Sequence, residues 1–125
     1  MYRGKQSLMK NVGENGCYIL SILESIGIQN TDAQLNMIKD LVDAGFLAKD
    51  LYVKDNEALA ARLGCSYQKL AIKPATDVYI KEYFNERTGF THFVLCVKDV
   101  DYDTLDDSVT VKEGYVKSYR IFKRK

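Results

Sequence analysis

The spacing of hydrophobic residues changes near Cys65, and this change constrains the fold more than any other feature of the chain. Before Cys65, apolar residues recur three and four positions apart, which is the spacing of one buried helix face. After Cys65, apolar residues alternate with polar ones and many are β-branched or aromatic, as in strands with one buried face. Helices followed by strands predict an α+β domain, with N-terminal helices packed on a mostly antiparallel C-terminal sheet.

Three helices are expected in the first half of the chain. The first begins at Cys17, carries apolar residues at i, i+3, i+4 and i+7, and ends before Gly27. The second begins at a capping sequence over residues 31–34 and ends at Gly45, and the third covers residues 55–64. The buried face of the second helix is expected to consist of Leu35, Ile38, Leu41 and Val42.

The residue pattern in the second half of the chain predicts five strands, over residues 66–72, 78–84, 90–98, 109–111 and 115–122. The second and third flank a short loop that ends in Gly89, and the fourth and fifth flank one that ends in Gly114. Each of these pairs is therefore expected to form a hairpin. The basic residues at 120–125 are expected at the exposed end of the last strand.

Length and charge narrow the class of protein. With 125 residues, 46% of them hydrophobic, the chain is expected to form one domain, residues 1–125, around a single core. A net charge of +1 gives no electrostatic basis for binding nucleic acid or an anionic membrane. Residues 1–16 lack the apolar core of a signal peptide, and the apolar run at 18–28 is too short to span a bilayer. Three cysteines do not suggest a disulfide framework, so a cytoplasmic location is expected, with the oligomeric state left open.

Cys17 is the candidate nucleophile. It follows the glycine-rich stretch at 12–16, so its thiol is expected in the first turn of a helix. There the unpaired backbone N–H groups and the helix dipole favour the thiolate, which is the nucleophilic form. The alternative is a small buried hydrophobic residue, the usual role of a cysteine outside disulfides. Cys65, which follows a helix C-terminus, and Cys96, within a strand, are expected to be structural.

His92 is the only histidine and opens a strongly apolar strand. Strand alternation puts His92, Val94 and Cys96 on one face. If the domain performs acid–base chemistry near neutral pH, His92 is the natural carrier; the alternative is a hydrogen-bonded core histidine. The acidic turn at 99–107 offers a carboxylate that could orient the imidazole.

The same acidic turn matches a calcium site only in part. Asp99, Asp101 and Asp103 have the alternating spacing of calcium ligands, but the glycine at the sixth position and the glutamate at the twelfth are missing. One histidine and three scattered cysteines show no zinc-ligand spacing. We therefore expect no metal and no cofactor.

The order of these residues resembles that of the papain-like cysteine peptidases of bacteria: Asn11, then Cys17 at a helix start, then His92 opening His-Phe-Val-Leu, then an acidic turn. It is similar to the small domains that process bacteriocin leader peptides, and to an uncharacterised family of small bacterial and phage proteins. The resemblance implies a papain-like fold with Cys17 as nucleophile and His92 as general base and acid. It further implies that Asp103 orients His92 and that Asn11, where the family has glutamine, helps to hold the oxyanion.

Within that resemblance, Asp101 is the alternative to Asp103, and Gln6 or Asn15 the alternative to Asn11. The expected function is a cysteine hydrolase that cleaves amide bonds, in a peptide or in a peptidoglycan cross-link, through an acyl-thioester on Cys17. Two other functions compete with it. One is a catalytically inactive papain-like module that binds a protein partner, and the other is a redox sensor in which Cys17 pairs with a second thiol.

Overall fold

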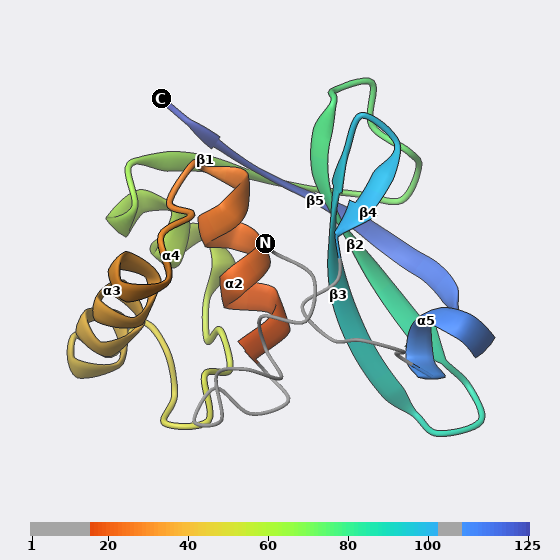
Figure 1. The fold of residues 1–125 in the computed structure, drawn as a ribbon, viewed down its shortest axis with the longest axis horizontal. Helices are drawn as coiled ribbons and strands as arrows, with labels where there is room; N and C mark the ends of the chain where they lie inside the picture. The colour runs from red at the N-terminus through yellow and green to blue at the C-terminus, as the bar shows by residue number, and fades with distance from the viewer. Residues whose placement is uncertain (1–15, 103–108) are drawn as a thin grey trace.

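The structure, a computed structural model, describes residues 16–102 and 109–125 (Figure 1). Its elements, in chain order, are α2 (Gly16–Ser25), α3 (Thr31–Asp43), α4 (Asn56–Arg62), β1 (Cys65–Leu70), β2 (Val78–Asn85), β3 (Phe90–Val97), β4 (Val100–Tyr102), α5 (Val109–Glu113) and β5 (Tyr115–Arg124). Figure 1 shows α2 lying between the sheet on one side and α3 and α4 on the other. The predicted α+β class, with N-terminal helices packed on an antiparallel sheet, is confirmed.

The five strands form one sheet in the order β1-β5-β2-β3-β4, and every neighbouring pair is antiparallel. The predicted hairpin of β2 and β3 is present, with Val78 opposite Val97 and Asn85 opposite Phe90. The acidic turn contains a strand that the sequence pattern did not reveal, since β4 pairs with the end of β3. The pairing of β2 with β5 shifts register between Glu82 and Tyr83, which marks a bulge.

The second predicted hairpin is wrong, because residues 109–113 form the helix α5. Strand β5 lies between β1 and β2, so both of its edges are already paired and a strand at 109–111 could not lie beside it. Gly114 joins α5 to β5 and donates its N–H to the carbonyl of Thr110. A Cβ at this position would stand 2.3 Å from the Thr110 carbonyl oxygen and 2.5 Å from that of Phe84. Glycine is therefore required here by close backbone contact rather than by a hairpin turn.

The predicted helix ends are correct at Gly27 and Asp55, but the cap of α3 lies one residue before the predicted capping sequence at 31–34. Gly27 follows α2 with φ of +89°, a conformation that glycine adopts without strain. Asn30 caps α3 by accepting the N–H of Ala33 at 3.1 Å, and Asp55 caps α4 by accepting that of Ala58 at the same distance. No helix in the part of the chain that the structure describes is long and apolar enough to cross a membrane.

The predicted buried face of α3 is partly wrong. Ile38 and Leu41 are buried as expected and Val42 is half-buried, but Leu35 is 42% exposed. The polar Gln34 is buried in its place, where its Nε2 donates to Glu24 Oε1 at 3.0 Å and to the Ile28 carbonyl at 2.8 Å. These two hydrogen bonds satisfy the NH₂ group of the buried amide. Helix α3 therefore contacts α2 through a polar side chain at this position.

The core lies between α2 and the sheet. Four apolar residues of α2 are fully buried, Ile19, Leu20, Ile22 and Leu23. Leu59 of α4, Ile80 of β2 and Leu95 of β3 pack in the same cluster. Because α2 is apolar on almost every side, its N-terminal turn is fixed firmly relative to the sheet, and with it the position of Cys17.

Candidate functional site

Cys17 is the second residue of α2, in the first helical turn as predicted. The residue is only 2% exposed, yet its side chain lines a pocket of about 290 Å³. The other walls come from Tyr18 next to it, from Glu82 of β2, from Arg120 of β5, from Thr91 and Phe93 of β3, and from the segment 52–56. Exposed residues at the mouth, Tyr52 and Thr91, open the pocket to solvent.

The β3 segment that carries His92 lies against the same turn of α2. Thr91 and Phe93 both line the pocket, and the Phe93 ring stacks on the Tyr18 ring. His92 lies between them with 4% of its surface exposed, in register with Tyr83 of β2. Alternation along β3 places the imidazole on the opposite side of the strand from the pocket walls. The structure therefore brings the two backbone segments together, with the thiol on the pocket side and the imidazole behind Thr91 and Phe93.

Tyr18 connects the helix to its surroundings. Its hydroxyl donates to Asn56 Oδ1 in a short hydrogen bond, and its ring meets Phe122 edge-on at 6.1 Å. Burial raises the pKa of the Tyr18 hydroxyl well above its ordinary value, although the Arg120 guanidinium acts in the opposite direction. Tyr18 is therefore a neutral hydrogen-bonding group in this pocket at physiological pH.

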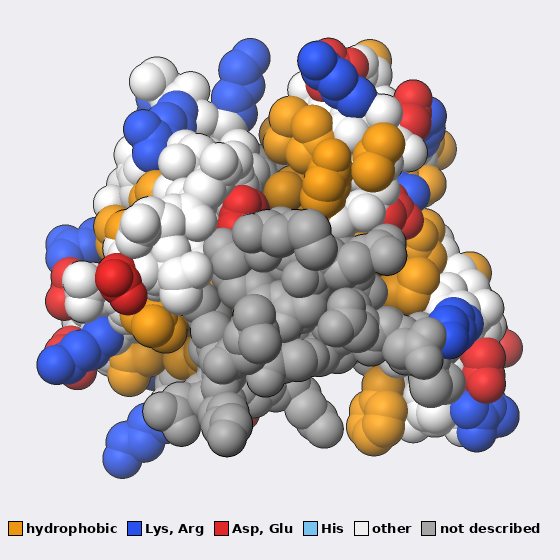
Figure 2. All heavy atoms as spheres, in the orientation of Figure 1, with side chains coloured by type: hydrophobic (Ala, Val, Ile, Leu, Met, Phe, Trp, Pro, Cys, Tyr) orange, Lys and Arg blue, Asp and Glu red, His pale blue; other side chains and the backbone are white. Residues whose placement is uncertain are grey.

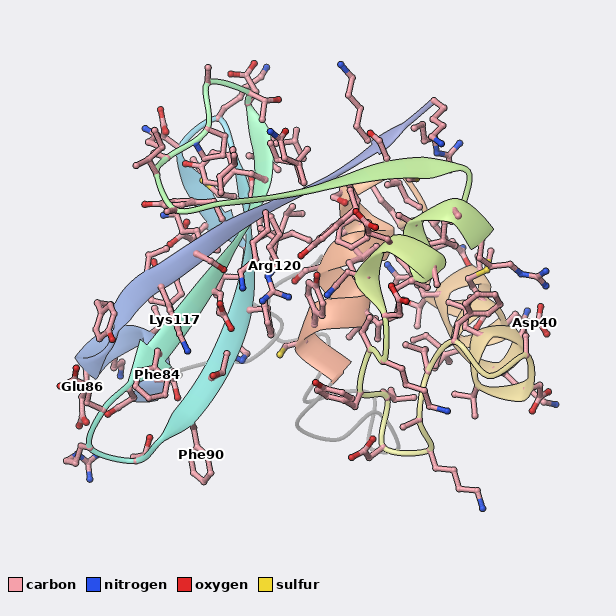
Figure 3. All side chains as sticks on the ribbon, turned by 180° about the vertical axis from the view of Figure 1, so that it is seen from behind. Asp40, Phe84, Glu86, Phe90, Lys117 and Arg120 are labelled. Carbon is pink, nitrogen blue, oxygen red and sulfur yellow. The ribbon has the colours of Figure 1, made fainter. Side chains whose placement is uncertain are left out.

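Arg120 and Glu82 bring opposite charges into the pocket wall. Both residues are buried, with Arg120 9% exposed, and Figure 3 shows Arg120 reaching from β5 toward α2. The Arg120 Nη2 lies 3.5 Å from Glu82 Oε1, which also accepts the hydroxyl of Ser118 at 2.7 Å. The guanidinium carbon lies 5.1 Å from the centroid of the Tyr18 ring and 5.0 Å from that of Phe93, within cation–π range.

Arg120 was not predicted as a site residue, because residues 120–125 were expected at the exposed end of the last strand. That expectation is wrong for Arg120 and Phe122, which are both buried. Strand alternation already contained the signal. Ser118, Arg120 and Phe122 share one face, and a buried apolar residue at one position of that face indicates that the others point inward too.

The remaining predicted site residues divide into two groups. Asn11, its alternatives Gln6 and Asn15, and Asp103 lie outside the described residues. Asp101 is described, and both of its carboxylate oxygens have partners on the β2 side. Oδ2 accepts the Tyr83 hydroxyl at 3.0 Å, and Oδ1 lies 2.9 Å from Lys81 Nζ. Asp101 therefore connects β4 to β2.

The other two cysteines lie away from the pocket. Cys65 and Cys96 are buried, and none of the three cysteines forms a disulfide. Burial raises the pKa of the Cys65 thiol, so less of it is present as the reactive thiolate. A raised pKa was also predicted from the place of Cys65 after a helix C-terminus. Within residues 16–102 and 109–125, no group of three His, Cys, Asp or Glu side chains is arranged to hold a metal ion.

Basic side chains are dispersed over the face of the molecule that Figure 2 shows. Figure 2 shows Lys and Arg side chains around the periphery of one face rather than gathered into one patch. A larger hollow of about 550 Å³ lies beside α3 and α4, and its described walls include Asp40, Arg62 and the chain end but no cysteine or histidine. Of these two pockets, the one beside Cys17 combines a nucleophile with buried polar groups.

The model of a protein family described as "Protein of unknown function, DUF261" matches residues 1–124. No curated protein and no solved structure matches the chain.

Proposed function

Since the chain belongs to the DUF261 family, whose function is unknown, we propose from the site itself that the protein is a cysteine hydrolase acting on amide bonds. Its substrate is a peptide or a peptidoglycan cross-link. The observation that carries the proposal is the position of Cys17, in the first turn of α2 and in the wall of a pocket that opens to solvent. A helix N-terminus stabilises the thiolate, and the pocket gives a substrate access to it.

The arrangement of elements supports a papain-like domain. A buried helix carries the cysteine at its start, and an antiparallel sheet packs against that helix through the strand that carries the histidine. The segment 91–93 and the first turn of α2 are in direct contact, so Cys17 and His92 belong to one region of the fold although they are far apart in the sequence. This likeness is one of architecture, and the chemistry is proposed on the residues.

In the proposed reaction, the Cys17 thiolate attacks the carbonyl carbon of the amide, and the electron pair of the carbonyl moves to oxygen. When the tetrahedral intermediate collapses, the C–N bond breaks and the amine leaves with a proton from the His92 imidazolium, which leaves an acyl-thioester on Cys17. This step requires the imidazole on the pocket side of β3, the side opposite to the one that strand alternation gives it in the structure. His92 then takes a proton from water and the resulting hydroxide attacks the thioester carbonyl. The C–S bond breaks, which releases the carboxylic acid and restores the Cys17 thiolate and the His92 imidazolium. A backbone N–H in the first turn of α2 and Asn11 would hold the oxyanion, and Asp103 would orient His92.

The test measures alkylation of each cysteine by iodoacetamide across a pH series, with the modified residues identified by mass spectrometry. Cys17 is expected to react at least about tenfold faster than Cys65 and Cys96 near pH 7, because it lies at a helix start beside a pocket that opens to solvent, whereas the other two are buried away from that pocket. The His92→Ala variant is expected to lose most of that difference. Cys65, whose thiol pKa burial raises, serves as an internal reference within the same molecule.

A second measurement distinguishes an enzyme from a binding module on the same fold. Incubation with a peptide thioester or an activated amide is expected to add an acyl group to Cys17, which intact-mass spectrometry detects. Equal alkylation of all three cysteines, unchanged in His92→Ala, together with no acylation of Cys17, would contradict the hydrolase proposal and favour the binding module.

A further inference from the structure

We propose that the pocket beside Cys17 is a specificity pocket for a primary carboxamide, the side chain of glutamine or asparagine in the substrate. This inference rests on the proposed function, because it names the class of substrate that reaches Cys17. Its basis is separate, however, since it comes from Arg120 and Glu82 rather than from the thiol.

The first observation is an unsatisfied donor. Arg120 Nε is buried and has no hydrogen-bond partner among the residues that the structure describes. Arg120 is also nine-tenths buried and lines the pocket. A buried donor without a partner costs about 1–3 kcal/mol, so stability alone does not account for an arginine held in this way. An acceptor atom from a bound molecule would complete its hydrogen bonds.

The second observation is the acceptor beside it. Glu82 lines the same pocket, and its Oε1 is occupied by Ser118 and Arg120. No described residue engages its Oε2, so this oxygen is available to accept. The register shift at Glu82 and Tyr83 falls at this point of β2, and bulges of this kind re-aim a side chain beside a site.

A donor and an acceptor in one pocket select among ligand groups. The oxygen of a carboxamide can accept from Arg120 Nε, and its NH₂ group can donate to Glu82 Oε2. A carboxylate would gain the first bond but would face the negative charge of Glu82 in a buried setting. An apolar side chain would leave both groups unpaired, and a site built for hydrogen bonds discriminates strongly against such a ligand.

The size and the walls of the pocket agree with a single side chain. A volume of about 290 Å³ is at the lower end of the range for small-molecule sites. Tyr18 and Phe93, whose rings stack on each other, provide apolar surface for the methylene groups that precede the amide. Thr91 and Tyr52 at the mouth leave room for the rest of a peptide to extend toward solvent.

The first experiment requires no catalysis. In the full-length protein, the ¹⁵N–¹H signal of Arg120 Nε is followed by NMR during titration with propionamide and, separately, with propionate. A saturable shift with propionamide and at least about tenfold weaker binding of propionate are expected, given the cost of placing a carboxylate beside Glu82. The Glu82→Gln variant removes that negative charge and is expected to reverse the preference toward propionate. No shift with either compound would overturn the inference, whatever Cys17 does.

The second experiment connects the pocket to the nucleophile. Three acyl-dipeptide chloromethyl ketones are compared, which differ only in a glutamine, glutamate or methionine side chain beside the reactive residue. The Cys17 sulfur displaces chloride and forms a thioether, and the rate is expected to be about tenfold higher for the glutamine compound. Arg120→Lys, which keeps the charge but loses the Nε donor, is expected to remove this preference.

The two proposals fail in different ways. If all three compounds modify Cys17 at equal rates in a manner that depends on His92, the specificity inference is wrong and the hydrolase proposal stands. If propionamide shifts the Arg120 signal but no compound modifies Cys17 selectively, the pocket binds carboxamides in a protein that is not a hydrolase. In that case the inference survives as a binding site, and its role in selecting a substrate for cleavage is overturned.

Discussion

The rings of Tyr18 and Phe93 stack with their centroids 4.1 Å apart and an interplanar angle of 23°. Tyr18 directly follows Cys17, and Phe93 directly follows His92. The contact therefore fixes the start of α2 against β3 at the two residues that flank the proposed catalytic pair. It also forms one wall of the pocket that Arg120 and Glu82 line.

Loss of this stacking contact is expected to weaken both the fold and the site. Phe93→Ala removes the ring from its contacts with Tyr18 and Arg120, and should destabilise the domain by about 2–3 kcal/mol. Chemical denaturation measures this change, and iodoacetamide alkylation should show a smaller difference between Cys17 and Cys65.

The matched control is Phe90→Ala on the same strand. Phe90 is 60% exposed and projects away from the end of β3 (Figure 3), so its loss should change stability by no more than about 0.5 kcal/mol. Equal effects of the two substitutions would contradict a special role for the Tyr18–Phe93 contact.

The polar contact between α3 and α2 is expected to matter more than a hydrophobic residue beside it. Gln34→Ala removes hydrogen bonds to Glu24 and to the Ile28 carbonyl inside the protein, at a cost of about 2–3 kcal/mol. Leu35→Ala, at the next position, should cost less than about 1 kcal/mol because Leu35 lies largely on the surface. Thermal or urea unfolding of both variants measures which substitution lowers stability more. A larger loss of stability for Leu35→Ala would contradict the burial of Gln34 in place of Leu35.

The contact of α5 with the hairpin of β2 and β3 is expected to weaken at acid pH. Hydrogen bonds from Asn85 and then from Arg87 hold the pKa of Glu113 below its ordinary value. A carboxyl group with a lowered pKa in the folded state contributes stability above its unfolded pKa and loses it as the pH falls through the folded pKa. The α5 contact should therefore weaken below the ordinary glutamate range, about pH 4, and stay constant above it.

Amide chemical shifts and hydrogen exchange of residues 109–114, followed as the pH falls, measure this loosening. Glu113→Gln is the matched variant, because it keeps the shape of the side chain and removes its titration. In this variant α5 should be weakly held at neutral pH and show no further change in acid. Retention of the wild-type acid transition in Glu113→Gln would assign the transition to another group.

Local sequence signals were sufficient for much of the helical half. Gly27 and Asp55, the capping residue of α4, mark chain positions that only particular residue types tolerate, so these helix ends could be predicted without knowledge of the partners. The start of α3 was predicted one residue too late, because Asn30 supplies its cap. The same holds for Cys17, whose place in the first turn of α2 follows from the glycines before it and the apolar run after it. The hairpin of β2 and β3 was also local, because its two strands are joined by one short loop.

Tertiary structure decided what depends on distant neighbours. Residues 109–113 have a sequence suited to a strand, but β5 is already paired on both edges, so they form a helix instead. Gln34 is buried and Leu35 exposed because Glu24 and the Ile28 carbonyl lie where an amide can meet them. Arg120 becomes a wall of the pocket only because β5 lies inside the sheet, between β1 and β2, where it faces α2 and Glu82. The sequence by itself thus determined the nucleophile's position on a helix, since helix starts are local, whereas the groups that would recognise a substrate come from strands that meet only in the folded sheet.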